Sequence, residues 1–103
     1  MINLLIAEKS KIVSICRNLR IRRLEVFGSA ANGNFDPLHS DLDFIVEFDN
    51  SDSKSSLLDS YLSLASQLES LLGRKVDLLT PKSIRNSYFR KKVDESRELI
   101  YED

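Results

Sequence analysis

The chain has 103 residues, of which 42% are hydrophobic and 30% charged, as expected of one small domain with a modest core. Because 16 acidic residues nearly balance 15 basic ones, the total charge gives no reason to expect nucleic acid or a membrane as a partner. No run approaches the roughly 20 apolar residues of a membrane span, and the apolar stretch 2–7 is too short for a signal peptide. A cytoplasmic location is expected, since the single cysteine, Cys16, has no partner for an internal disulfide.

The first predicted element is a helix over residues 7–19, where apolar side chains recur at the spacing of one helical face. These side chains are Ile12, Ile15, Cys16 and Leu19. We therefore expect Cys16 in the core. The basic segment 20–23 is interpreted as a solvated surface turn or, alternatively, as a contact to a partner or a phosphate.

A short strand is predicted at residues 24–27, and Gly28 and Ser29 follow it directly. Glycine permits a close backbone approach and dihedral angles that other residues avoid. A Gly-Ser pair at a strand end offers backbone N–H groups and a hydroxyl to a phosphate, and a helix starting near Ala30 would add to the attraction. The pair therefore predicts a phosphate-binding turn.

Two aspartates open the next predicted strand, residues 41–48, after a loop over 32–40. Side chains alternate between the faces of a strand, so Asp41 and Asp43 share one face, opposite the apolar residues that point into the core. Two strand positions span about 6.6 Å, and at an effective dielectric of about 20 the two carboxylates repel by about 2–3 kcal/mol. Such a pair either lies in open water or binds a cation. The loop also holds the only histidine, His39, which we interpret as solvated.

A long helix is predicted over residues 54–72, with a wide leucine-rich face and Gly73 as its C-terminal stop. A third strand at 75–79 follows, and Asp77 is the one acidic residue in it. If this strand pairs beside the preceding one, Asp77 joins the same acidic face.

Thr80 and Pro81 predict the start of another helix, because they supply an N-cap and a proline at the first helical position. This last helix is expected to cover 81–95, and the apolar tail 99–101 is expected to pack back on the domain. The elements together predict one α/β (α+β) domain over residues 1–103. Its small mixed sheet has three to four strands, with helices packed mainly on one face.

Acidic residues gather in the middle of the chain, where residues 25–52 hold seven Asp or Glu and no Lys or Arg. This block suits metal binding and would repel a nucleotide that arrives without its metal. Three carboxylates from two strands call for a cation, and Mg²⁺ prefers such oxygen ligands while keeping waters and substrate phosphates in its shell. Those carboxylates are Asp41, Asp43 and Asp77. With a phosphate-binding turn beside them, they predict a site for a metal–triphosphate.

Other motif interpretations fail on detail. An EF-hand loop beginning at Asp41 would need a polar fifth residue and a glycine at the sixth, where the chain has Ile45 and Val46. A P-loop would need Gly-Lys-Ser/Thr, which is absent. Sugar-nucleotide glycosyltransferases also use Asp-x-Asp, but the chain is too short for their fold. The only histidine has no context for a Ser-His-Asp set.

These residues resemble the polymerase-β-type nucleotidyltransferases, and specifically the minimal nucleotidyltransferases (MNT) that form the antitoxin half of HEPN/MNT toxin–antitoxin pairs. The resemblance covers nearly the whole chain, and its motifs are Gly28-Ser29, Ser40-Asp41-Leu42-Asp43 and Val76-Asp77-Leu78. It implies an enzyme that transfers AMP from ATP to a hydroxyl and releases pyrophosphate. In the antitoxins the acceptor is a tyrosine of the HEPN ribonuclease toxin, and the transfer silences the toxin.

The same resemblance implies roles for individual residues. Two Mg²⁺ ions would be bound by Asp41 and Asp43, and Asp77 would complete the site and help to activate the acceptor hydroxyl. The nucleotide-binding positions would be Gly28, Ser29 and Ser40, with the first two on the β- and γ-phosphates.

One departure from the family pattern bears on activity. The family usually reads Gly-Ser-Arg-x-Arg-Gly after the first strand, whereas this chain has Ala30 and Asn32 at the arginine positions. Affinity for ATP is therefore expected to be weaker unless a partner supplies a basic residue, and an antitoxin that neutralises its toxin by binding alone is the alternative. A stand-alone enzyme acting on a small molecule is less favoured, since such enzymes usually carry a second domain to hold the acceptor and we expect a single domain here.

Overall fold

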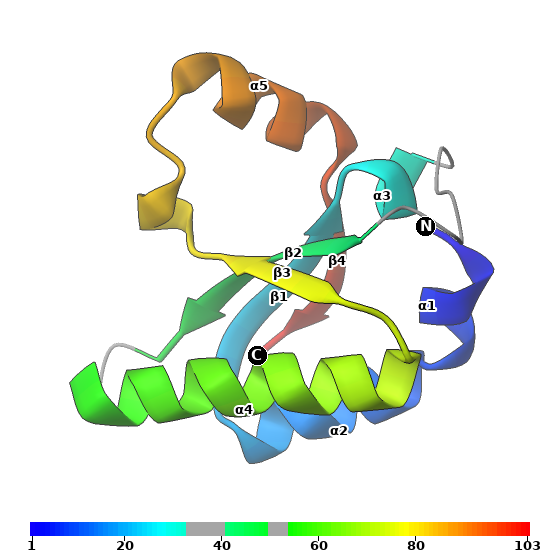
Figure 1. Ribbon diagram of the computed structural model, residues 1–103, viewed down its shortest axis with the longest axis vertical. Helices are drawn as coiled ribbons and strands as arrows, with labels where there is room; N and C mark the ends of the chain where they lie inside the picture. Colours follow the sequence, from blue (N-terminus) through cyan, green and yellow to red (C-terminus); the bar gives the residue numbers. More distant parts are fainter. Residues whose placement is uncertain (33–40, 50–53) are drawn as a thin grey trace.

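The computed structural model describes residues 1–32, 41–49 and 54–103 (Figure 1). In these residues a four-stranded sheet has the order β3-β2-β1-β4. Its strands are β1 (Ile21–Phe27), β2 (Leu42–Phe48), β3 (Val76–Leu79) and β4 (Glu98–Glu102). β1 pairs antiparallel with both β2 and β4, whereas β2 and β3 run parallel. The predicted mixed sheet of three to four strands is therefore confirmed.

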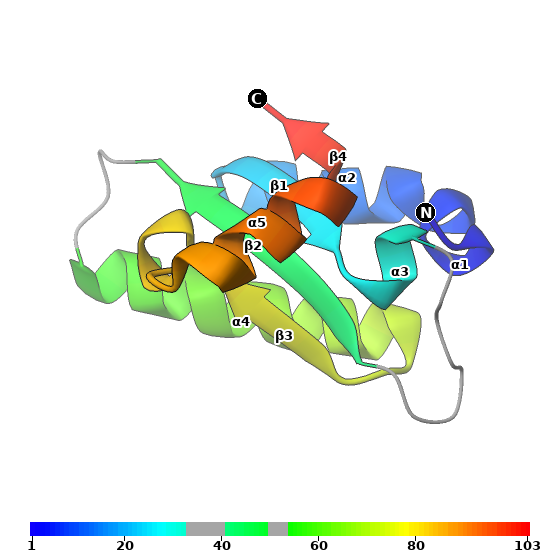
Figure 2. The ribbon, with the colours of Figure 1, turned by 90° about the horizontal axis from the view of Figure 1, so that it is seen from above.

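Helices cover the two faces of this sheet unequally (Figures 1 and 2). One face carries α1 (Asn3–Ala7), α2 (Lys9–Asn18) and the long α4 (Lys54–Leu72). The opposite face carries α5 (Ser87–Ser96) and the short 3₁₀ helix η1 (Pro81–Ser83), and α3 (Ser29–Asn32) is a single turn directly after β1. Helices thus pack mainly on one face, as predicted. None of the described helices is long and apolar enough to cross a membrane.

The hydrophobic core is divided by the sheet into two clusters. The larger cluster lies under α1, α2 and α4 and takes alternate residues of the strands, including Leu42, Phe44 and Val46 of β2. It also holds Cys16, whose burial raises the pKa of the thiol to about 12, as suits a core residue. The smaller cluster lies under α5 and consists of Phe27, Ile45, Ile84 and Val93, with Leu79 and Phe89 packed against it. Side chains alternate along the strands, so that Phe27 of β1, Ile45 of β2 and Leu79 of β3 lie on the face that carries α5.

The N-terminal helix differs from the single helix predicted over 7–19. The chain is already helical from Asn3, breaks at Glu8 (φ −99°, ψ 9°) and continues as α2 from Lys9. The apolar spacing of α2 is as predicted, with Ile12 and Cys16 buried. The preceding turn was missed because its one buried residue, Leu5, makes too short a pattern for a helical period to be recognised.

The basic segment 20–23 is not a simple surface turn. β1 begins at Ile21, and Arg23 lies inside the strand, where it makes ion pairs with Glu25, Glu47 and Glu102. The last of these partners belongs to β4, which forms from the tail expected only to pack back on the domain. Pairing of Ile21 and Arg23 with β2, and of Arg23 with β4, extends β1 beyond the predicted strand at 24–27.

The last helix was predicted as one element over 81–95 and is in fact two. Thr80 and Pro81 do start a helix, with the reciprocal capping hydrogen bonds of a capping box, but η1 ends after one turn. The chain then extends through Ile84, whose side chain is buried in the smaller cluster. Asn86 caps α5 by accepting a hydrogen bond from the Phe89 N–H at 3.0 Å. Burial of Ile84 thus interrupts what local signals predict as a continuous helix.

Candidate active site

Asp43 and Asp77 are direct neighbours across the parallel pair of β2 and β3. The residues on either side of each one, Leu42, Phe44, Val76 and Leu78, are buried in the larger core cluster. Both carboxylates therefore lie on the other face of the sheet, the one that carries α5. Asp43 is half-buried, whereas Asp77 is exposed. The structure thus brings together two of the three predicted carboxylates.

The surroundings of Asp43 oppose its negative charge. Burial, the charges of Asp77 and Asp41 and a side-chain hydrogen bond with Asp77 together raise the pKa of Asp43 from 3.8 to about 6. Desolvation is the largest of these effects, and the neighbouring carboxylates add repulsion. A carboxyl in such surroundings gains from the arrival of a positive charge.

Asp41 belongs to the same acidic group, since its charge contributes to the raised pKa of Asp43. It is half-buried, immediately before β2, and is held there because the next residue, Leu42, donates its N–H to the Lys75 carbonyl at 3.1 Å. Among the described residues, no three His, Cys, Asp or Glu side chains are close enough to form a metal site by themselves. The predicted nucleotide-binding position Ser40 lies outside the described residues, as does His39, which we interpreted as solvated.

Gly28 faces Asp43 at close range. Its φ of +74° is in the left-handed region that favours glycine, and a β-carbon there would stand 3.0 Å from Oδ2 of Asp43. The preceding residue, Phe27, is the register partner of Asp43 across β1 and β2. The predicted phosphate-binding turn and the acidic face therefore meet in one place.

The residues after Gly28 explain one departure from the family pattern. Ser29 is half-buried and begins α3, while Ala30 and Ala31 are buried in the larger core cluster. The carbonyl of Ala30 accepts the Ile2 N–H at 2.9 Å, which fixes α3 against the N-terminal segment. An arginine at position 30 would have to be accommodated in a packed interior, so in this chain that position serves the core.

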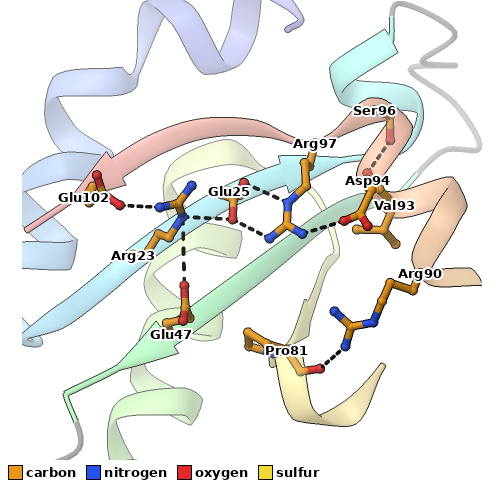
Figure 3. Close-up of polar contacts among 10 residues, drawn as sticks. All are labelled: Arg23, Glu25, Glu47, Pro81, Arg90, Val93, Asp94, Ser96, Arg97 and Glu102. Atoms are coloured by element: carbon orange, nitrogen blue, oxygen red, sulfur yellow. Dashed lines mark hydrogen bonds and ion pairs between the residues drawn. The ribbon is translucent and has the colours of Figure 1, made fainter. Parts of the chain in front are cut away.

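An ion-pair network on the same face of the sheet was not predicted (Figure 3). Glu25 is only 4% exposed, and Arg97 donates two hydrogen bonds of 2.9 and 2.6 Å to its carboxylate. Arg23 adds a third at 3.0 Å, and hydrogen bonds from Arg97 and then Arg23 hold the pKa of Glu25 below its usual range despite burial. Glu25 therefore serves the fold. Its one sequence signal was a charge between the core residues Leu24 and Val26.

A second contact that the sequence did not predict joins the end of α5 to the turn at Gly28. The Gly28 N–H donates to Oγ of Ser96 at 2.9 Å, and Ser96 is the last residue of α5. No local pattern marks such a contact, because its two partners are 68 positions apart.

Comparison with known proteins identifies the family of this chain. A family model described as "Nucleotidyltransferase domain" matches residues 9–100. MJ1379 of Methanocaldococcus jannaschii, provisionally named a protein adenylyltransferase, is 43% identical over 82 residues, which are 80% of this chain and 77% of that protein. MJ0435 of the same organism, with the same provisional name, is 41% identical over 76 residues, or 74% of this chain and 76% of that protein.

Solved structures share the fold. One, provisionally described as a minimal nucleotidyltransferase, is 29% identical with a TM-score of 0.73 and matches 94% of this chain and 95% of that chain. A toxin–antitoxin crystal structure with AMP-PNP has a TM-score of 0.66 at 22% identity, over 92% of this chain and 73% of that chain. A tri-AMPylated Shewanella oneidensis HEPN toxin in complex with MNT antitoxin gives 0.60 at 19% identity, over 94% and 71%. The last two show a common fold alone.

Since the family model spans most of the chain, the protein belongs to the nucleotidyltransferase domain family.

Proposed function

We propose that this protein transfers AMP from Mg–ATP to a hydroxyl group of a partner protein, and that the partner is a HEPN toxin silenced by the transfer. The observation that carries the proposal is the pairing of Asp43 with Asp77 directly opposite Gly28. Membership of the nucleotidyltransferase family supports nucleotidyl transfer, and the names of the M. jannaschii relatives support a protein acceptor. The resemblance to the MNT antitoxins suggests a HEPN toxin with a tyrosine acceptor, and the S. oneidensis complex of the same fold pairs an MNT antitoxin with an AMPylated HEPN toxin.

The acidic donor set fits a hard divalent cation. Mg²⁺ prefers carboxylate oxygens and leaves part of its shell to water and substrate phosphates. A cation would also offset the burial and the repulsion between carboxylates that raise the pKa of Asp43. We assign Asp41, Asp43 and Asp77 to holding two Mg²⁺ ions, whose chemistry is to neutralise charge that develops on the triphosphate.

The turn after β1 is assigned to the β- and γ-phosphates. Without a side chain, Gly28 lets the turn approach Asp43 closely, and Ser29 offers its hydroxyl and its backbone N–H to a phosphate. Ser40 stays a predicted nucleotide-binding position. The nucleotide would thus lie between this turn and the acidic strands.

In the proposed reaction, the acceptor hydroxyl oxygen bonds to the α-phosphorus while the bond from that phosphorus to the bridging oxygen breaks, and pyrophosphate leaves. Asp77 is the more exposed carboxylate of the central pair, so we assign to it the proton of the incoming hydroxyl. A protein of this size needs only rigid carboxylates and a phosphate turn for this step. The partner would complete the pocket around the acceptor.

The test is incubation with ATP labelled at its α-phosphate, Mg²⁺ and the product of the adjacent gene. Label is expected on that protein with the wild type and with Asp59→Asn, which removes an exposed carboxylate on α4. It should be lost with Asp41→Asn plus Asp43→Asn. Absence of label with the wild-type protein would count decisively against transfer.

A second candidate function is neutralisation of the toxin by binding alone. It is favoured by one observation, since position 30 is an alanine buried in the core and supplies no charge for a triphosphate. The double variant Asp41→Asn plus Asp43→Asn separates the two functions. If it still neutralises the toxin at stoichiometric dose, binding suffices. If neutralisation is lost while the complex still forms, transfer is required.

A further inference from the structure

The C-terminal end of α5 is connected to the candidate active site by two consecutive residues. Figure 3 shows Ser96 and Arg97 at this end of the helix, with Arg97 reaching across the sheet to Glu25 on β1. Ser96 accepts the N–H of Gly28 on the turn that follows the same strand. The two contacts therefore attach α5 to β1 at points three residues apart, one at the turn and one within the strand.

The Arg97 contact gives this connection rigidity. Its guanidinium makes two parallel hydrogen bonds to a carboxylate that is almost fully buried and a further one to Asp94 at 2.7 Å. Bidentate, charge-assisted pairs of this kind are strong and have a fixed geometry. Phe89 and Val93 add apolar contacts, with Phe89 edge-on to Phe27 at a ring separation of 6.1 Å. The end of α5 is thus held in one position relative to β1.

The Ser96 contact determines which donors of the turn are left for a ligand. Its Oγ lies 2.9 Å from the Gly28 nitrogen, while its own hydroxyl hydrogen is within reach of the Lys92 and Val93 carbonyls at 3.4 and 3.5 Å. A backbone N–H has one hydrogen to donate. Because the Gly28 N–H already donates to Ser96, the hydroxyl and the backbone N–H of Ser29 are the next donors of the turn that could bind a phosphate.

We propose that Ser96 is a positioning residue for nucleotide binding: it holds the Gly28 N–H, fixes the turn and directs the Ser29 donors to the phosphates. The role rests on the proposed function for its ligand, Mg–ATP. Ser96 acts through the turn and does not touch the nucleotide. It differs from the family motif because it comes from the opposite end of the chain and from another element.

A competing account makes the opposite prediction. If a phosphate displaced Ser96 and took the Gly28 N–H itself, Ser96 would compete with the nucleotide. Removing its hydroxyl would then strengthen binding, whereas removing a positioning residue weakens it. The direction of the change in Mg–ATP affinity therefore distinguishes the two accounts.

The experiment compares Ser96→Ala with Ser96→Thr, which keeps the hydroxyl, and with Ser87→Ala, which removes an exposed serine at the other end of α5. The first readout is hydrogen exchange of the Gly28 amide in the full chain without nucleotide. We expect about tenfold or faster exchange for Ser96→Ala and wild-type exchange for the other two variants.

The second readout is the dissociation constant for Mg–ATP by titration calorimetry. We expect it to rise about five- to tenfold for Ser96→Ala, as for loss of one hydrogen bond, and to return toward the wild-type value for Ser96→Thr.

Unchanged exchange of the Gly28 amide in Ser96→Ala overturns the proposal, and so does Mg–ATP affinity that is unchanged or stronger. A weaker affinity shared equally by Ser96→Thr, at an unchanged thermal midpoint, also overturns it. If the wild type itself does not bind Mg–ATP, the proposed function fails. The positioning of the turn by Ser96 is then decided by the amide exchange alone.

Discussion

A β-carbon on Gly28 would stand 3.0 Å from Oδ2 of Asp43, so the turn after β1 and the acidic face of β2 leave no room for a side chain between them. This closeness connects the two halves of the motif, the Gly-Ser turn and the Asp-x-Asp strand. Every part of the proposed nucleotide site depends on it.

Gly28→Ala is therefore expected to abolish Mg–ATP binding. Gly73 gives a matched control, because it also has a positive φ, of +66°, but has nothing within 4 Å of its β-carbon position. Both substitutions should lower the free energy of unfolding by about 1 kcal/mol through backbone strain. Only the change at Gly28 should remove nucleotide binding in calorimetry, and equal binding losses in the two variants would show that the turn has no special role.

Removing the charge at position 43 should stabilise the protein in the absence of metal. The folded-state pKa of Asp43, about 6, lies above its value of 3.8 in the absence of the fold. The folded state therefore binds more protons between these values, and its stability falls as pH rises through this range. At pH 7.5 Asp43→Asn should raise the free energy of unfolding by about 1 kcal/mol, after allowance for partial exposure, and the thermal midpoint by about 4–8 °C.

The measurement for this prediction is thermal unfolding at pH 7.5 with EDTA, with Asp59→Asn as the control carboxylate on α4. The control variant should melt with the wild type. A lower midpoint for Asp43→Asn than for the wild type would show that Asp43 stabilises the apo fold and would contradict the electrostatic account of the site.

Metal affinity should depend on pH through the same group. A protonated Asp43 cannot serve as a ligand, so Mg²⁺ affinity is expected to be nearly constant above pH 7 and to fall as pH drops through about 6. Titration of the stabilisation by Mg²⁺ at several pH values measures this dependence. An affinity that stays constant down to pH 5 would exclude Asp43 as a ligand.

The buried pair of Glu25 and Arg97 should dominate acid unfolding in this part of the sheet. Because the pKa of Glu25 is lowered in the folded state, first by its hydrogen bonds from Arg97, its contribution is present above the ordinary glutamate pKa of about 4.3. That contribution is lost as pH falls through the lower, folded-state value. Stability measured by urea unfolding should therefore decline below about pH 4.

Replacing only Arg97 leaves Glu25 buried without its main partner. Arg97→Met is expected to cost about 3 kcal/mol at pH 7, as for one half of a buried ion pair. Glu25→Gln in the same protein should recover part of this loss, because it removes the uncompensated charge. If the double variant were as unstable as the sum of the two single variants, the pair would not be coupled.

The acidic strands could be predicted from sequence because their signals are local. Alternation alone assigns Asp43 and Asp77 to the face away from the larger core, and an isolated charge in an apolar strand is visible in a window of five residues. The break at Ile84 could not be predicted, since the local signals, an N-cap at Thr80 and a proline at the first helical position, agree with one helix. Only the smaller core cluster, which fixes the Ile84 side chain, interrupts it.

Contacts between residues far apart in the sequence could not be predicted for the same reason, because no local pattern marks them. The acidic middle block was interpreted as suited to metal binding as a whole, yet Glu25 is neutralised by Arg97, a residue 72 positions away. Ser96 carries no motif, and its contact to Gly28 exists only because α5 ends beside β1. Sequence pattern thus identified the residues of the acidic face, whereas the residues that position the turn required the fold.

The most direct measurement compares ATP labelled at the α-phosphate with ATP labelled at the γ-phosphate, each incubated with Mg²⁺, this protein and the product of the adjacent gene. The account predicts that α-label is transferred to a tyrosine of that protein while γ-label is released as pyrophosphate, and that Asp43→Asn abolishes both. Transfer of γ-label, or transfer of α-label by Asp43→Asn at the wild-type rate, would contradict it.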